Sequence, residues 1–459
     1  MARQTIPPAF KAELNAMLRL SAPLALANLL QMAVYAIDVV FVARLGEATL
    51  AAASLAVSMF MLIMFGFSSV TSAVAPLIAA ELGRRRHAVR EVRRSFRMAL
   101  WLALACTVVG MAVCQLGEPF MLLTGQDPAI SARAQDFLTV LSFSMLPMIV
   151  SNVLRTLVAT MGRPVFATVI TALAIVVNAA GNYVFVFGHF GAPALGLEGS
   201  AISTILTTIV TCIAYAVAIR RDRTLRRYRL FGRIWRPEWQ RLRQIVRIGI
   251  PIALTVMAEG GLFSSAAFLM GRIGSAELAA HTVALQVAAF FFQIPFGIGQ
   301  AATIRVGYHY GAGNRAAIGQ AGLAAIVLTV LFQAVSCGVM LLAPGAVLSV
   351  YVDTRLPANA ALVVLATQYL LIAAAFQFAD GLQAVAAGAL RGLQDTRVPM
   401  WIAIGSYWLV GFALSVGLGL FTPLEGTGVW IGLAAGLFVA AWLLLVRWQR
   451  RERLGLVPS

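Results

Sequence analysis

The chain has 459 residues, of which 60% are hydrophobic and only 12% are charged, and its mean hydropathy is +0.86. A soluble protein of this length would have too few charged residues to cover its surface, so the composition excludes that class and predicts an integral membrane protein. The formal net charge of +17 would by itself also suit a nucleic-acid-binding protein.

Twelve apolar segments are each long enough to cross a roughly 30 Å hydrocarbon core as a helix. The polar stretch before the first segment predicts an interfacial helix at the N-terminus, and we expect no signal peptide there. The sequence therefore predicts an all-α polytopic membrane protein. In chain order, the segments are expected at residues 17–43, 50–80, 95–116, 135–158, 164–188, 196–219, 246–271, 277–306, 318–342, 360–388, 398–420 and 427–447.

The basic residues predict an orientation in the membrane. If consecutive segments cross the bilayer, 31 of the 35 basic residues fall on one side, and only Arg44, Arg133, Arg272 and Arg355 fall on the other. This bias follows the positive-inside rule and predicts that both termini are cytoplasmic. Because the arginines lie in separate loops beside membrane segments, the distribution also argues against a nucleic-acid partner.

The sequence repeats with an offset of 228 residues: residues 21–57 align without gaps on residues 249–285, and Pro23 meets Pro251. Each half then holds six segments, and because six is even, both halves enter the membrane in the same sense. We expect two six-helix lobes related by a pseudo-two-fold axis along the membrane normal. Their expected limits are 1–219 for the N-terminal lobe, 220–245 for a basic cytoplasmic linker, and 246–459 for the C-terminal lobe with its basic tail.

Three carboxylates lie inside otherwise apolar segments, at Asp38, Glu259 and Asp380. A charged group at bilayer depth costs roughly 2.5–3.5 kcal/mol on insertion scales, so such residues usually serve a function. Counted at about 1.5 Å per residue from the arginines expected at the interfaces, Glu259 and Asp380 lie near the midplane, and Asp38 lies in the outer part of its lobe. The three acids predict a path for ions or charged solutes.

Glutamines accompany the two midplane acids. A spacing of seven residues puts Gln286, Gln293 and Gln300 on one helix face, and Gln377 lies one turn before Asp380. Their side chains could supply oxygen ligands to a hard cation such as Na⁺, or they could only join neighbouring helices. We expect the second role for Gln300, near a helix end, and place the other three among the candidate cavity residues with both roles open.

Two carboxylates close together in a medium of low dielectric cannot both remain ionised without a large energetic cost. If Glu259 and Asp380 face one cavity, a proton, a Na⁺ ion or an organic cation could each relieve their repulsion. The sequence therefore predicts a cation site at this pair, at which the three species compete.

In the N-terminal half, amide side chains are candidate partners of Asp38. Asn178 and Asn182 are four residues apart and share a helix face, and Asn152 lies on the preceding segment. Unpaired amides are costly in hydrocarbon, so these side chains should turn inward. We assign these residues to a second polar site, with Asp38 as a candidate cation-coupling residue and the three asparagines and Tyr35 as residues of the substrate or cation cavity. Packing between helices would also account for the amides.

Three stretches resemble the multidrug and toxic-compound extrusion (MATE) transporters, in particular the NorM-like branch: DVVFVARLG from Asp38, GSAELAAHTVALQV from Gly274, and FQFADGLQAVAAGALRGLQDTRVP from Phe376. The resemblance extends over essentially the whole chain. It matches Glu259 and Asp380 to the acids of cation-coupled exporters. It likewise matches Asp38 to the N-lobe acid, and Asn178 and Asn182 to the asparagines of the fifth span. Some relatives have a carboxylate where Asn182 stands, so the resemblance favours the C-terminal pair as the coupling site.

The resemblance implies an antiporter of the bacterial inner membrane, and not an enzyme. It would export organic, often cationic, compounds in exchange for Na⁺ or H⁺ by alternating access, with no cofactor beyond the coupling ion. We expect small organic cations and membrane lipid as partners, and a monomeric protein. One alternative is a flippase for lipid-linked precursors, which would use basic cavity residues to hold phosphates. Another is an intramembrane enzyme, for which the sequence shows no nucleophile–base pair.

Overall fold

The computed structural model describes residues 8–85, 88–232 and 234–458, and every regular element within these ranges is helical. Eleven helices are long and apolar enough to cross a membrane, or twelve if one bent pair of helices counts as a single span. The predicted all-α membrane protein is thereby confirmed.

The chain divides into two compact units, which are described separately. Unit 1 comprises Met1–Ala25 and Leu254–Ser459, and unit 2 comprises Leu26–Ala253. Two helices therefore contribute to both units: α1 (Pro8–Ala43) and α10 (Trp239–Ile273). The predicted lobes follow chain order, whereas in the structure the first turns of each of these helices belong to the unit built mainly from the other half of the sequence.

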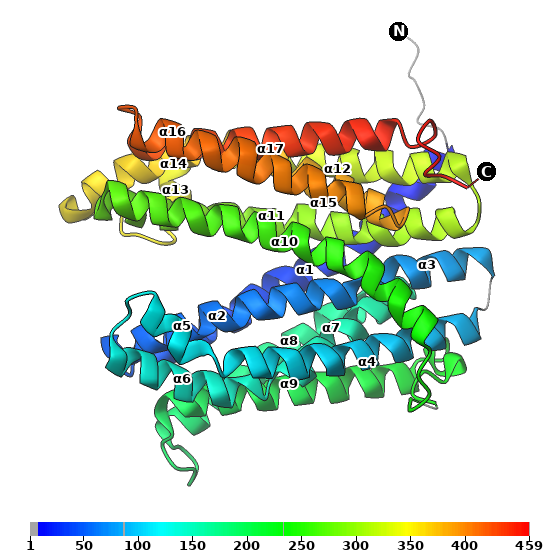
Figure 1. The fold of residues 1–459 in the computed structure, drawn as a ribbon, viewed down its shortest axis with the longest axis horizontal. Helices are drawn as coiled ribbons and strands as arrows, with labels where there is room; N and C mark the ends of the chain where they lie inside the picture. Colours follow the sequence, from blue (N-terminus) through cyan, green and yellow to red (C-terminus); the bar gives the residue numbers. More distant parts are fainter. Residues whose placement is uncertain (1–7, 86–87, 233, 459) are drawn as a thin grey trace. The chain divides into compact units, whose positions relative to one another are not determined.

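Unit 2 is a bundle in which α8 packs along α9, and α7 contacts α9, α4 and α2. The side chain of Asp127 begins one of its helices by accepting hydrogen bonds from the backbone amides of Ala129 and Ile130. Besides its parts of α1 and α10, the unit contains α2 (Glu47–Ser72), α3 (Val74–Arg84), α4 (Val89–Cys114), α5 (Gly117–Leu123), α6 (Pro128–Ser142), α7 (Met145–Thr160), α8 (Val165–Phe187), α9 (Gly196–Arg221) and the 3-10 helix η1 (Leu225–Tyr228) (Figure 1).

Two sequence predictions for these helices were wrong in detail. The continuous segment expected at 135–158 is instead the pair α6 and α7, bent by 48°, because Pro147 has no amide hydrogen to donate to the carbonyl of Phe143. The described part of the expected interfacial helix is the start of α1, which runs unbroken from Pro8 to Ala43. Residues 1–7 of that segment lie outside the described chain.

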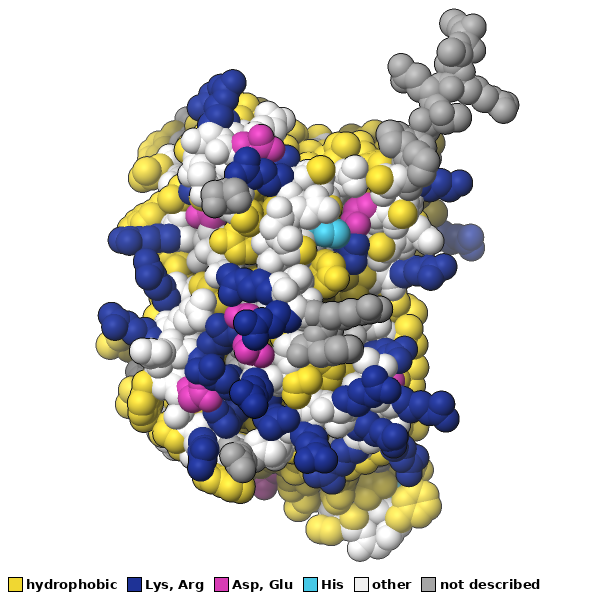
Figure 2. Space-filling view, turned by 90° about the vertical axis from the view of Figure 1, so that its right-hand side faces the viewer, with side chains coloured by type: hydrophobic (Ala, Val, Ile, Leu, Met, Phe, Trp, Pro, Cys, Tyr) yellow, Lys and Arg dark blue, Asp and Glu magenta, His cyan; other side chains and the backbone are white. Residues whose placement is uncertain are grey.

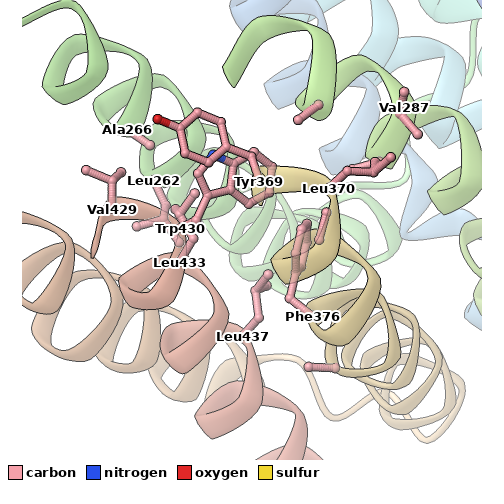
Figure 3. Close-up of a cluster of buried hydrophobic side chains, with 14 of the residues drawn as sticks. Leu262, Ala266, Val287, Tyr369, Leu370, Phe376, Val429, Trp430, Leu433 and Leu437 are labelled. Atoms are coloured by element: carbon pink, nitrogen blue, oxygen red, sulfur yellow. The ribbon is translucent and has the colours of Figure 1, made fainter. Parts of the chain in front are cut away.

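Unit 1 is organised around α14, which packs along α11 and also contacts α12 and α17. Figure 3 shows part of its core, where the ring of Trp430 on α17 stacks on Tyr369 with 6.0 Å between centroids and meets Phe376 at 5.6 Å. With its parts of α1 and α10, the unit contains α11 (Ser275–Gly311), α12 (Arg315–Leu342), α13 (Pro344–Leu348), the 3-10 helix η2 (Pro357–Asn359), α14 (Ala360–Gly392), α15 (Arg397–Ile404), the π-helix η3 (Gly405–Phe412), α16 (Ala413–Leu420) and α17 (Glu425–Gln449).

Small residues on α17 permit a close helix contact. A Cβ added to Gly432 would lie 2.3 Å from the backbone nitrogen of Ser415 on α16, and one added to Gly436 would lie 2.8 Å from Cα of Gly411 on η3. Glycines repeated at every fourth position therefore bring the two backbones together, as such motifs commonly do in membranes.

The segments of α1 and α10 that lie in the opposite unit are held by ion pairs at equivalent positions of the repeat. On α1, the carboxylate of Glu13 accepts hydrogen bonds from Nε and Nη2 of Arg305 at 2.8 and 2.6 Å, and lies 3.2 Å from Nε2 of His309. On α10, Nη2 of Arg241 donates to Glu81 at 3.1 Å. The 228-residue offset relates Glu13 to Arg241 and Glu81 to His309. The same pair of repeat positions is therefore in contact in both units. In unit 1 the acid is Glu13 and the base is His309, whereas in unit 2 the base is Arg241 and the acid is Glu81.

Candidate functional site

In unit 1, two of the predicted membrane acids meet at one amide side chain. Nε2 of Gln383 lies 3.2 Å from Oε1 of Glu259 and 3.4 Å from Oδ1 of Asp380. Oε1 of Gln383 accepts a hydrogen bond of 2.8 Å from the hydroxyl of Tyr407. Asp380, Gln383 and Tyr407 are buried, and Glu259 is half-buried. A connected polar cluster therefore lies inside apolar helices and joins α10, α14 and η3.

Local geometry explains why these four groups meet. Asp380 and Gln383 are three residues apart on α14 and so share one helix face. Tyr407 lies in η3, where the hydrogen bonds run from i to i+5 and the turn is wider than in an α-helix. Gly261 lets η3 approach α10 closely, since an added Cβ would lie 2.8 Å from the ring of Trp408. A side chain at Gly261 would therefore require the ring of Trp408, the neighbour of Tyr407, to move.

Glu259 and Asp380 are among the site residues predicted from the sequence, whereas Gln383 and Tyr407 are not. Gln377 lies one turn before Asp380 and Gln383 lies one turn after it. The same helical spacing therefore allows Gln383 to be predicted as a partner of Asp380 from the sequence. Tyr407 could not be predicted in this way, because its position depends on a π turn for which the sequence shows no signal.

The remaining glutamines lie elsewhere. Gln377 is fully buried; its Nε2 donates to the carbonyl of Ala288 on α11 at 2.9 Å, and Gln333 on α12 donates to its backbone carbonyl at 2.8 Å. It therefore joins three helices, which is the packing role left open above. Gln286 is exposed and Gln293 is half-buried. In the described chain, neither donates a hydrogen bond to the acid pair.

A positive charge lies near the acid pair. Arg391, two turns beyond Gln383 on α14, is half-buried and interacts electrostatically with Glu259. Arg391 is one of the 31 basic residues that the sequence places on the cytoplasmic side. Its side chain instead contributes to the charge balance of the site, which comprises two carboxylates, one guanidinium and two neutral polar groups.

In unit 2, Asp38 on α1 meets the two asparagines of α8. Its Oδ1 accepts hydrogen bonds from Nδ2 of Asn178 at 2.9 Å and of Asn182 at 2.8 Å. Ser203 on α9 fixes this arrangement by donating to the backbone carbonyl of Asn178 at 3.0 Å. Oδ1 of Asn182 is buried without a hydrogen-bond partner in the described chain. The structure thus brings together three residues that the sequence assigned to one site and places an unused acceptor beside them.

The other two predicted members of this site have different partners. Asn152 donates to the backbone carbonyl of Ser68 at 3.2 Å. Tyr35 lies one turn before Asp38 on α1 and hydrogen-bonds to the side chain of Gln31. Arg155 is one of the 31 basic residues that the sequence places on the cytoplasmic side. It is half-buried, donates to the side chain of Asn28, and acts electrostatically on Tyr35.

The MatE family model matches residues 23–184 and 251–416, two stretches whose starts are separated by the same 228 residues as the repeat. The chain belongs to the MatE family. A relative from Mesorhizobium japonicum, described as a probable multidrug resistance protein NorM, is 43% identical over 97% of this chain and 95% of its own length. The multidrug resistance protein NorM of Burkholderia vietnamiensis is 36% identical over 96% and 95% of the two chains.

Solved structures share this fold. The eukaryotic MATE transporter AtDTX14 superposes with a TM-score of 0.85 at 19% identity, over 97% of this chain and 98% of that one. A transporter from Pyrococcus furiosus, described as having a binding pocket of reverse polarity, gives 0.84 at 21% identity, over 99% and 100%. The family model and the curated relatives confirm the resemblance to NorM-like MATE proteins, and the MatE protein described here is a multi-pass membrane protein.

Proposed function

We propose that this MatE protein exports small organic, often cationic, compounds across the bacterial inner membrane in exchange for Na⁺ or H⁺. Its curated relatives carry the name multidrug resistance protein. The observation that carries the proposal is the contact of Glu259 and Asp380 with one Gln383 inside membrane-spanning helices. Both termini would lie in the cytoplasm, in agreement with the distribution of arginines, and the protein would act as a monomer.

The charge balance at the pair supports exchange. When both carboxylates are ionised, Arg391 compensates for one of them, and the site retains one net negative charge. A proton, a Na⁺ ion or a monovalent organic cation would each neutralise that charge. Because the site is enclosed by apolar helices, holding two of these species at once would leave an uncompensated positive charge in a low dielectric. Binding of one would therefore displace another, and this competition is sufficient for exchange.

We propose that the Asp38 site has a second, supporting role. It offers one carboxylate and the unused Oδ1 of Asn182, which are oxygen ligands of the kind that hard cations prefer. Among the residues that the structure describes, the hydrogen-bonding partners of Asp38 are Asn178 and Asn182, and neither is an acid. A site with one carboxylate has less repulsion to relieve than the pair in unit 1, so we assign coupling to the pair.

The flippase alternative would require arginines that hold phosphate groups. The two half-buried arginines near the candidate sites act on groups of the protein itself: Arg155 bonds to Asn28, and Arg391 acts on Glu259. This arrangement favours the exporter.

The test uses purified protein in liposomes loaded with an ethidium-type dye, with Na⁺ and H⁺ gradients imposed separately. Glu259→Gln and Asp380→Asn each remove one carboxylate and keep its shape, so we expect at least about tenfold slower gradient-driven efflux, the equivalent of about 1.4 kcal/mol. Asp353→Asn, at a residue outside the membrane helices, is the matched control and should transport normally. Native rates in both site variants would refute the coupling role. Flipping of a labelled lipid-linked precursor without dye efflux would favour the flippase.

A further inference from the structure

The connection between α9 and α10 is a folded cap on the end of unit 2. Leu225, Tyr228 and Leu230 are 0, 7 and 2% exposed and pack in one core cluster with Phe96 of α4. The backbone carbonyl of Tyr228 also accepts a hydrogen bond of 3.1 Å from Nε of Arg93. The segment predicted to be a linker therefore has a fixed structure, which determines where its charged side chains lie.

The cap carries a large excess of positive charge. Residues 220–247 contain eleven arginines and only two acids, Asp222 and Glu238. Both acids are already paired with arginines outside the cap: Asp222 with Arg163 at 3.0 Å, and Glu238 with Arg94 and Arg97. Figure 2 shows the face on which arginines gather. The exposed arginines of the cap include Arg221, Arg223, Arg226, Arg227, Arg229 and Arg236.

Two tryptophans lie beside these arginines with little protection from the surroundings. Trp235 is 73% exposed and Trp239 is 68% exposed. Trp239 is the first residue of α10, which is long and apolar enough to cross a membrane. The apolar segment expected in this helix begins at residue 246, about 10 Å further along at 1.5 Å per residue, so we place the two tryptophans beside the membrane surface. Tryptophan is enriched at this level of a membrane because its ring is apolar and its N–H group remains in the headgroup region.

We propose that the cap is a binding surface for anionic phospholipid headgroups of the leaflet from which it emerges. Guanidinium groups bind phosphate oxygens in a two-pronged geometry that ammonium groups cannot provide, and the chain uses arginine for 34 of its 35 basic residues. The exposed tryptophans anchor the same surface in the headgroup layer. A free phosphate or a nucleic acid would use the arginines but would leave the tryptophans, and the position between two spans, unexplained.

The test measures binding of phosphatidylglycerol and phosphatidylcholine to the full-length protein by native mass spectrometry. In the variant R223Q/R226Q/R227Q/R229Q, we expect affinity for phosphatidylglycerol to fall at least about tenfold, since each basic residue near an anionic surface contributes appreciably. Affinity for phosphatidylcholine should not change. The matched control R315Q/R397Q/R450Q/R453Q removes the same charge from exposed arginines of unit 1 and should retain most of the binding. Brominated phosphatidylglycerol quenches the fluorescence of tryptophans that it contacts. In bilayers of this lipid, the quenched fraction of the tryptophan fluorescence should be smaller in W235S/W239S than in the unmodified protein.

Several results would overturn the proposal. Equal losses in the two arginine variants would mean that any positive charge suffices, and no loss in the cap variant would mean that its arginines are not used. Displacement of phosphatidylglycerol by millimolar inorganic phosphate, or by a single-stranded oligonucleotide, would assign the surface to those ligands instead. Thermal unfolding of each variant shows whether it is folded. Transport is not measured, so the outcome is independent of the proposed exchange activity.

Discussion

Replacing Gln383 by leucine removes the amide from between Glu259 and Asp380 while keeping a side chain of similar size. The change deletes two hydrogen bonds to carboxylates, at 3.2 and 3.4 Å. Both are long for N–H···O bonds, so each is expected to contribute only about 1 kcal/mol. It also leaves the buried hydroxyl of Tyr407 without its 2.8 Å acceptor, which costs about 1–3 kcal/mol. We therefore expect the free energy of unfolding to fall by about 3–5 kcal/mol.

Transport should change in a way that a general loss of stability does not predict. Without the neutral donor, the repulsion between the two carboxylates is greater, and a cation that relieves it binds more tightly. We expect the half-saturating concentration of the coupling cation to fall, and the maximal efflux rate to fall about tenfold, because release becomes slower. Dye efflux from liposomes at varied Na⁺ and pH measures both quantities, and thermal unfolding in detergent gives the stability.

Tyr407→Phe separates the two contributions. It leaves the amide–carboxylate contacts in place but takes the donor away from Oε1 of the buried Gln383, so we expect a loss of stability of about 1–3 kcal/mol. The double variant Gln383→Leu/Tyr407→Phe no longer contains an unpaired hydroxyl. We expect its free energy of unfolding to be about 1–3 kcal/mol higher than that of Gln383→Leu alone. The reasoning fails if Gln383→Leu transports with native cation dependence, or if the double variant is less stable than the sum of its parts.

Two further predictions concern stability in detergent. Glu13→Gln breaks a partly buried ion pair and leaves Arg305 without its carboxylate, so we expect a loss of about 1.5–3 kcal/mol; thermal unfolding that matches the unmodified protein would contradict a stabilising role for this pair. Gly432→Val should destabilise by about 1–3 kcal/mol, because even its Cβ would lie 2.3 Å from the backbone of Ser415. Gly338→Ala, where an added Cβ meets nothing within 4 Å, is its control and should unfold as the native protein does.

Hydropathy and helical spacing predicted much of this protein because both act locally. Each span can be predicted from the length of its own apolar segment, and a carboxylate inside such a segment can be recognised from its apolar neighbours. The contact of Asp38 with Asn178 and Asn182 could be anticipated because amides spaced four apart must find a polar partner inside the membrane. The role of Gln377 could not, since a buried glutamine serves a cavity or a neighbouring backbone equally well.

The features that the sequence did not reveal depend on tertiary partners. Tyr407 reaches Gln383 through a π turn, and the bend before α7 arises where Pro147 has no amide hydrogen to donate. The exchange of the first turns of α1 and α10 between the units depends on which helix each segment packs against. Chain order predicts lobes made of consecutive segments, and only the coordinates show that α1 and α10 each begin in one unit and end in the other.

The repeated ion pairs have a consequence for the pairing of the two halves. Glu13 meets His309, and Arg241 meets Glu81. If two copies of the N-terminal half assembled in the same manner, Glu13 would face Glu81, and two copies of the C-terminal half would set Arg241 against His309. At these positions each half is thus complementary in charge to the other half, whereas two copies of the same half would bring two acids or two basic groups together. The two halves are therefore not interchangeable at these contacts, and synthesis as a single chain supplies one copy of each.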